Sequence, residues 1–208
     1  MDREKLKSTT SIFTESVREL LSGSEGEHIW LNGIAKMVLS MMNLEVIRED
    51  VNQFKKYVES GDILDFGTGS GYIAILLESD GFKVKAVDVN SYDEYEKNNY
   101  NRLMIQDQKK LWGNLTDSHK NLMFTYYKDI LPYKDNSFDG VCAYAVFEHI
   151  PASKIPNVLD EIHRVLKPGG IFLYLVSQEN LPFQNIWRKF LDLGFMKNYI
   201  GIMKCHVY

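Results

Sequence analysis

Cysteine and proline are both scarce in this chain of 208 residues, which has two cysteines and five prolines. Cys142 and Cys205 stand far apart, so they offer neither a disulfide framework nor metal-ligand spacing, and we expect both to be reduced. No apolar run reaches the roughly 20 residues that cross a bilayer. The charged start, residues 1–5, does not have the pattern of a secretory signal. These absences predict a cytoplasmic protein without a membrane span.

An excess of positive charge is missing as well. The chain has 24 basic and 28 acidic residues, which gives a net charge of −4. A protein that binds nucleic acid needs a basic face to neutralise phosphates, and no such cluster stands out. Hydrophobic residues make up 45% and charged residues 25%, which is typical of a globular protein with one core. We therefore expect no nucleic-acid partner, and the oligomeric state stays open.

The first 60 residues have the periodicity of helices. One helix is expected to start near Thr10 and Ser11, and a buried one is expected over residues 30–42. A third is indicated by apolar residues on one helical face, namely Ile47, Val51, Phe54 and Val58, with Gly61 as its stop. We predict a helical cap over residues 1–60 and a second domain over residues 61–208.

From Asp62 onward, short apolar runs alternate with helical segments. Strands are expected at residues 63–66, 84–87, 122–127, 140–144 and 171–176. Helices are expected at residues 73–77, 92–111 and 158–166, followed by a turn at 167–170, and later by a helix at 185–193 and one or two strands within 199–208. Such alternation builds right-handed βαβ units. The predicted fold class is α/β, a Rossmann-like, doubly wound, mostly parallel sheet.

A glycine-rich loop is the strongest motif. Residues 65–71, Asp-Phe-Gly-Thr-Gly-Ser-Gly, follow the first expected strand and open a helix. Glycines permit a tight turn and close approach of a ligand to the backbone, and the helix start offers free N–H groups. Asp88 ends the second strand, 21 residues after Gly67, where a carboxylate can bind ribose hydroxyls. The alternative for Asp88 is a solvated acidic residue in a loop.

Several motifs in order resemble the class I S-adenosylmethionine-dependent methyltransferases, and within them the type 11 group typified by the quinone-biosynthesis methyltransferases. The resemblance covers about residues 61–176. It rests on the segments 63–71, 84–90, 129–139, 146–150 and 159–170, the last of which ends in Leu-Lys-Pro-Gly-Gly. It implies S-adenosyl-L-methionine as cofactor, the Rossmann-like fold, and methyl transfer to an acceptor that the sequence does not identify.

The resemblance also implies roles for individual residues. Asp65 would reach the methionine ammonium, and Asp88 would bind both ribose hydroxyls. Asp129 would accept a hydrogen bond from the adenine amino group, unless it is only a turn residue, and Ile130 would pack beside the ring. The remaining expected cofactor-binding residues are Phe66, Gly67, Thr68, Gly69, Gly71, Val89, Ala143 and Tyr144.

His149 is the candidate general base, because its ordinary pKa suits proton transfer near neutrality. The alternative is a histidine that only hydrogen-bonds the following loop or borders the methionine pocket. Some relatives bind a divalent metal through an acidic residue four positions earlier, where this chain has Ala145. We therefore predict no metal. His28 and Trp30 could cover the cofactor, and Tyr92, Tyr95 and Tyr100 could line an entrance, although plain packing is the alternative for each.

Two other functions fit part of the pattern. A dehydrogenase would use the same first two motifs, but its fingerprint is G-x-G-x-x-G, and Tyr72 stands where the third glycine belongs. A noncatalytic S-adenosylmethionine-binding module that regulates a partner is the second alternative. The leading prediction is a methyltransferase acting on a small-molecule or lipid-like acceptor, with O-, N- or C-methylation undetermined.

Overall fold

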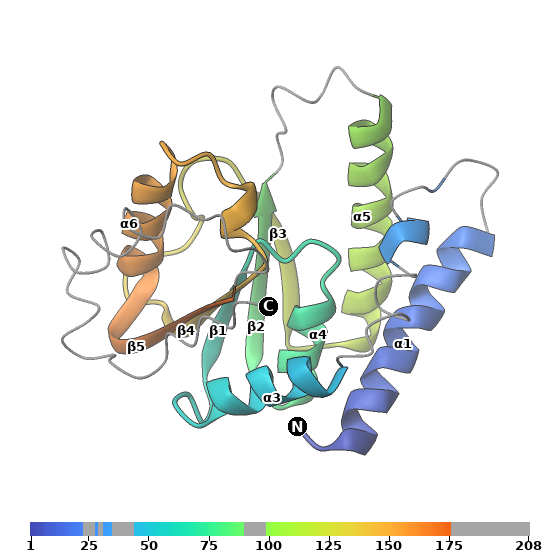
Figure 1. Ribbon diagram of the computed structural model, residues 1–208, viewed down its shortest axis with the longest axis horizontal. Coiled ribbons are helices and arrows are strands. Elements are labelled where there is room, and N and C mark those ends of the chain that lie inside the picture. The colour runs from blue at the N-terminus through green and yellow to red at the C-terminus, as the bar shows by residue number, and fades with distance from the viewer. Residues whose placement is uncertain (23–27, 29–30, 35–43, 90–98, 176–208) are drawn as a thin grey trace.

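The computed structural model describes residues 1–22, 28, 31–34, 44–89 and 99–175, and within them a parallel sheet lies between two helical layers (Figure 1). The elements are α1 (Arg3–Ser22), α3 (Leu44–Lys55), β1 (Asp62–Phe66), α4 (Tyr72–Ser79), β2 (Lys83–Val89), α5 (Asn99–Ser118), β3 (Leu122–Tyr127), β4 (Phe138–Tyr144), the 3₁₀ turn η1 (Phe147–His149), α6 (Ile155–Val165) and β5 (Leu166–Leu175). The predicted Rossmann-like α/β fold is confirmed.

The sheet has the strand order β3-β2-β1-β4-β5, and all its pairs are parallel. The chain builds outward from β1 in one direction, then crosses to β4 and builds in the other. The order therefore reverses between β1 and β4, and ligands of open α/β sheets bind beyond the carboxyl ends of the strands at this point. Asp65 lies there, paired with Ala86 on one side and Cys142 on the other.

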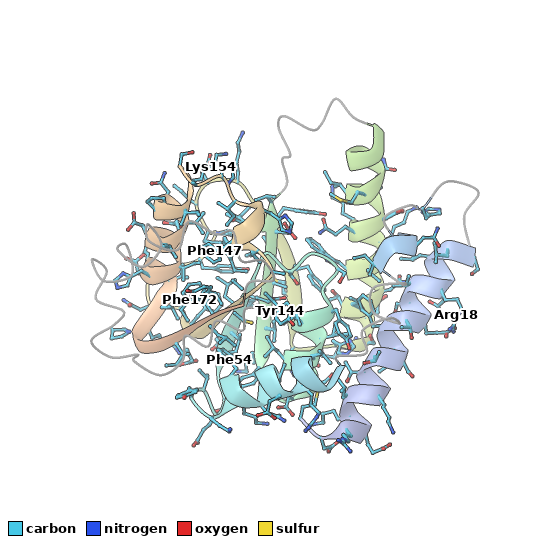
Figure 2. All side chains as sticks on the ribbon, viewed as in Figure 1. Arg18, Phe54, Tyr144, Phe147, Lys154 and Phe172 are labelled. Carbon is cyan, nitrogen blue, oxygen red and sulfur yellow. The ribbon has the colours of Figure 1, made fainter. Side chains whose placement is uncertain are left out.

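Each face of the sheet has its own hydrophobic cluster, because successive strand residues point to opposite sides. Ile63 packs with the cluster beneath α1, α3, α4 and α5, whereas Leu64 packs with the cluster beneath α6. The α6 side includes Phe147 and Phe172, which Figure 2 shows on the same side of the sheet. Burying both faces explains why consecutive apolar residues, such as Ile63 and Leu64, occur within the strands.

The first helix starts earlier than predicted. Asp2 is its cap, since the Asp2 side chain accepts a hydrogen bond of 2.8 Å from the Lys5 N–H. The start near Thr10 and Ser11 is therefore wrong, and both residues lie inside α1. The predicted stop of the third helix at Gly61 is also late, because α3 ends at Lys55.

Two further boundaries differ. Helix α5 continues past the predicted end at residue 111 to Ser118, because Leu115 keeps its buried face going. The predicted turn at 167–170 lies inside β5, where the pairing jumps from Phe138–Leu166 to Gly140–Ile171. The expected helix segment at 35–42, the start of the helix predicted at 92–111 and everything predicted after Leu175 lie outside the described residues.

Candidate functional site

The glycine loop lies beyond the carboxyl end of β1 and is tied to the neighbouring strand. The N–H groups of Gly67 and Thr68 donate to the Val87 carbonyl at 2.8 and 3.0 Å. Gly67, Gly69 and Gly71 have φ values of +73°, +54° and +84°, which residues other than glycine rarely adopt. This alternation of left-handed residues turns the chain sharply from β1 into α4.

The three glycines differ in what surrounds them. A Cβ at Gly67 would lie 2.5 Å from Val146 Cγ2, and one at Gly71 would lie 2.6 Å from Phe124 Cζ. A Cβ at Gly69 would have nothing of the protein within 4 Å. Gly67 and Gly71 are thus needed for packing within the protein. Gly69 instead exposes its backbone to open space at the edge of the sheet.

Asp65 is a buried carboxylate at the same edge, with 1% of its surface exposed. Burial raises the pKa of the Asp65 carboxyl to about 7, and the Asp88 carboxylate adds to this rise, while Thr68 and the Ala74 amide oppose it. Asp65 Oδ2 and Thr68 Oγ1 are buried and have no hydrogen-bond partner within the described part of the chain. A buried carboxylate with a free oxygen is costly, and an ammonium group is the kind of partner that would stabilise its charged form.

The Asp88 carboxylate is hydrogen-bonded to the glycine loop. Its Oδ2 accepts a hydrogen bond of 2.7 Å from the Gly69 N–H, and its Oδ1 accepts one of 2.8 Å from the Val89 N–H. Burial raises the pKa of the Asp88 carboxyl, and these two N–H groups oppose the rise. The expectation of a merely solvated carboxylate does not fit this geometry, because the side chain joins the ends of β1 and β2.

Two residues that the sequence did not single out bind the same loop. Gln108 Nε2 and Trp112 Nε1 of α5 both donate to the Gly69 carbonyl, at 2.8 and 3.1 Å. Tyr126 Oη donates to Gln108 Oε1 at 2.7 Å, which fixes the orientation of the Gln108 amide. The only signal in the sequence was their i, i+4 spacing, which places them on one helical face.

Asp129 and Ile130 are exposed, and Ile130 has 71% of its surface in contact with solvent. The chain just after them is clamped by α6. Glu161 Oε2 accepts a hydrogen bond from the Leu131 N–H at 2.8 Å, and Arg164 donates to the Leu131 carbonyl at 3.1 Å. An apolar side chain presented on a fixed loop is suited to packing against a flat ring.

Tyr127, the last residue of β3, lies close to two acidic residues, Asp88 and Asp129. Burial raises the pKa of the Tyr127 hydroxyl, and the carboxylates of Asp88 and Asp129 add to the rise. Its ring lies 5.5 Å from that of Phe66, centroid to centroid. Tyr127 thus packs against Phe66 of β1.

The segment after β4 forms the opposite wall. Ala143 is buried and Tyr144 is half-buried at the end of the strand, and Ala145 has a left-handed φ of +54°. This turn brings Val146 against Gly67, so the following turn η1 lies beside the glycine loop. His149 ends η1 and is exposed. Its backbone N–H donates to the Val146 carbonyl at 2.9 Å, and within the described residues no hydrogen bond orients its imidazole.

The residues predicted to cover the cofactor or line an entrance are only partly described by the structure. His28 Nδ1 lies at hydrogen-bond distance, 3.0 Å, from Asp107 Oδ1 of α5, so the His28 side chain contacts the protein. Trp30, Tyr92 and Tyr95 lie outside the described residues, as does the side chain of Tyr100. Among the residues that the structure describes, no three His, Cys, Asp or Glu side chains gather closely enough to bind a metal ion. None of the described helices combines the length and the apolar character that crossing a membrane requires.

Part of this chain is similar to curated methyltransferases. A sterol 24-C-methyltransferase of Gibberella zeae is 35% identical over 111 residues, which are 53% of this chain and 26% of the relative. A demethylmenaquinone methyltransferase of Symbiobacterium thermophilum is 30% identical over 147 residues, covering 64% of this chain and 47% of the relative. The chain thus spans about half or less of these curated relatives.

Solved structures of methyltransferases have a similar fold. The crystal structure of a putative S-adenosyl-L-methionine-dependent methyltransferase from Methanococcus maripaludis superposes with a TM-score of 0.54 at 15% identity, over 84% of this chain and 77% of that one. The family model described as "Methyltransferase domain" matches residues 26–204. With the quinone-biosynthesis relatives, this match confirms the resemblance predicted from the motifs, and the chain belongs to the methyltransferase domain family.

Proposed function

We propose that this chain binds S-adenosyl-L-methionine beyond the carboxyl ends of β1 and β2 and transfers its methyl group to a small-molecule or lipid-like acceptor. The observation that carries the proposal is the pair Asp65 and Asp88 around the glycine loop. Asp65 has a buried oxygen without a partner in the described part of the chain, suited to the ammonium of the methionine portion. Asp88 is fixed beside it by the Gly69 N–H, in the position of a ribose-binding carboxylate.

The rest of the edge fits the same cofactor. The open space at Gly69 leaves room for the ligand to approach the backbone. Exposed Ile130 offers an apolar surface to the adenine ring, and Asp129 offers an acceptor to its amino group. Phe66, Thr68, Val89, Ala143 and Tyr144 complete the proposed site at the ends of β1, β2 and β4.

The chemistry of methyl transfer belongs to the sulfonium of the cofactor, which leaves as a neutral thioether. The residues of the chain bind it, orient it and hold the acceptor in line, an effect that can contribute about 7–11 kcal/mol. A hydroxyl or ammonium acceptor must also lose a proton. We propose that an imidazole nitrogen of His149 takes it, because η1 lies beside the glycine loop.

The acceptor class follows from the relatives, whose names are those of sterol and quinone-precursor methyltransferases. The division into a helical cap over residues 1–60 and a cofactor domain over 61–208 and a cytoplasmic location are likewise proposals. A noncatalytic binding module is the second candidate, since the exposed imidazole of His149 has no described partner that orients it.

Methyl transfer from labelled cofactor to a lipid and small-molecule extract tests the proposal. We expect a labelled product that separates from the cofactor in chromatography and that an Asp65→Ala variant does not form. Binding of the cofactor without any labelled product would favour the noncatalytic module. The absence of both binding and product would contradict the proposal.

A further inference from the structure

The face of α5 toward the glycine loop carries a hydrogen-bonded group that the methyltransferase motifs do not include. Gln108 and Trp112 are four residues apart, so their side chains leave the helix on one side. Both are 4% exposed. Both donate to one atom, the Gly69 carbonyl oxygen, at 2.8 and 3.1 Å. A carbonyl oxygen has two lone pairs, so these two donors saturate it.

The same peptide is fixed from its other end, because the Gly69 N–H donates to Asp88 Oδ2 at 2.7 Å. Gln108 Nε2 also lies 3.5 Å from that oxygen, at the limit of a hydrogen bond. Gly69 is therefore held by α5 through its carbonyl and by β2 through its amide. A glycine with a φ of +54° and open space on one side has little else to define its position.

The donors are themselves held rigidly. The Trp112 ring stacks on Phe124 with centroids 4.8 Å apart and an interplanar angle of 6°, and it also contacts Tyr126 at 4.7 Å. Tyr126 Oη donates to Gln108 Oε1, so the amide of Gln108 must direct its N–H₂ group to the loop. Side chains with fixed rotamers and fixed donors are what a precise binding geometry requires.

We propose that Gln108 and Trp112 are positioning residues for the cofactor. They fix the Gly69 peptide and, through it, set the Asp88 carboxylate for the ribose hydroxyls. The inference rests on the proposed function, since it assigns these residues to the S-adenosylmethionine site. It predicts that the protein loses affinity for the cofactor when either donor is removed, because the Gly69 peptide is then held less firmly.

Equilibrium dialysis with labelled S-adenosylhomocysteine tests the inference on the full chain. Trp112→Phe retains an aromatic ring but removes the N–H donor together with part of the indole ring, and Gln108→Met keeps the length and removes the amide. Gln106→Met is the matched control, because Gln106 is exposed on the same helix. We expect each test variant to bind about three- to tenfold more weakly, in line with one lost hydrogen bond, and the control to bind like the wild type.

A double-mutant cycle with Asp88→Ala separates positioning from general loosening. If Gln108 acts through Asp88, Gln108→Met has much less effect on affinity in the Asp88→Ala background than in the wild type. Equal effects in both backgrounds, or wild-type affinity in both test variants, would overturn the inference. Failure of the wild type itself to bind the ligand would instead contradict the proposed function. If Gln108→Met does not fold, the same double-mutant cycle is carried out with Trp112→Phe and Asp88→Ala, and it is read in the same way.

Discussion

Replacing Asp65 with asparagine should stabilise the protein and weaken its hold on the cofactor at the same time. The carboxyl has an ordinary pKa of 3.8 and a pKa of about 7 in the folded protein, mainly because it is buried. The folded state therefore binds the proton more tightly than the unfolded state. Stability falls as the pH rises from about 4 to about 7 and then levels off, and the full cost is about 4 kcal/mol at 1.36 kcal/mol per pKa unit.

The asparagine amide of the Asp65→Asn variant cannot ionise, so the variant lacks this cost. Urea unfolding at pH 5, 6, 7 and 8 should show the free energy of unfolding of Asp65→Asn exceeding that of the wild type, by an amount that grows by about 2–3 kcal/mol between pH 5 and 8. Asp117→Asn is the control, because Asp117 is an exposed carboxylate on α5, and no such growth is expected from it.

Cofactor binding should move in the opposite direction. Loss of a charged hydrogen bond to the ammonium, worth about 1.5–3 kcal/mol, should weaken S-adenosylhomocysteine binding by about tenfold to a hundredfold. Binding of 5′-methylthioadenosine, which lacks the amino-acid portion, should hardly change. A stability difference that does not grow with pH, or an unchanged affinity for S-adenosylhomocysteine, would refute the assignment of Asp65.

Four other substitutions test separate parts of the structure. Gly69→Ala should lower the free energy of unfolding by only about 1–2 kcal/mol, because alanine is strained at this left-handed φ, yet calorimetry should show much weaker cofactor binding. Gly67→Ala should unfold at a lower temperature than the wild type, because its Cβ would meet Val146. Wild-type affinity in Gly69→Ala would contradict this. Arg164→Met should lower the free energy of unfolding in urea by about 2 kcal/mol, because it removes the hydrogen bonds from Arg164 to the Leu131 and Tyr133 carbonyls. Amide hydrogen exchange in residues 129–135 should become faster, and unchanged exchange would contradict this role of Arg164. His149→Ala should lower turnover of an oxygen or nitrogen acceptor by about a hundredfold or more with little change in cofactor affinity, and equal activity would end the role of His149 as a base.

The sheet and the cofactor loop were predictable from local patterns. The largely apolar run at residues 122–127 predicts a strand, and β3 has those bounds in the structure. The loop 65–71 was found because the turn itself demands glycine, and the structure gives all three glycines a positive φ. Signals of this kind depend on a few neighbouring residues, so the sequence alone displays them.

What could not be predicted depends on contacts between distant segments. Gln108 and Trp112 reach Gly69 only because α5 packs back over the sheet, and nothing local distinguishes them from other helical residues. The register shift inside β5 is similar, because only the pairing with β4 shows that Leu166 and Ile171, on either side of residues 167–170, belong to the same strand. The cap at Asp2 was missed because the apolar periodicity further along α1 drew the start toward Thr10.

Isothermal titration of the purified protein with S-adenosylhomocysteine, beside the Asp65→Asn and Asp88→Ala variants, is the decisive test of the proposed cofactor site. The wild type should take up one equivalent of ligand, and each variant should bind at least about tenfold more weakly while it still unfolds cooperatively. A wild type that gives no binding heat and no protection against thermal unfolding, or variants that bind as tightly as the wild type, would contradict it.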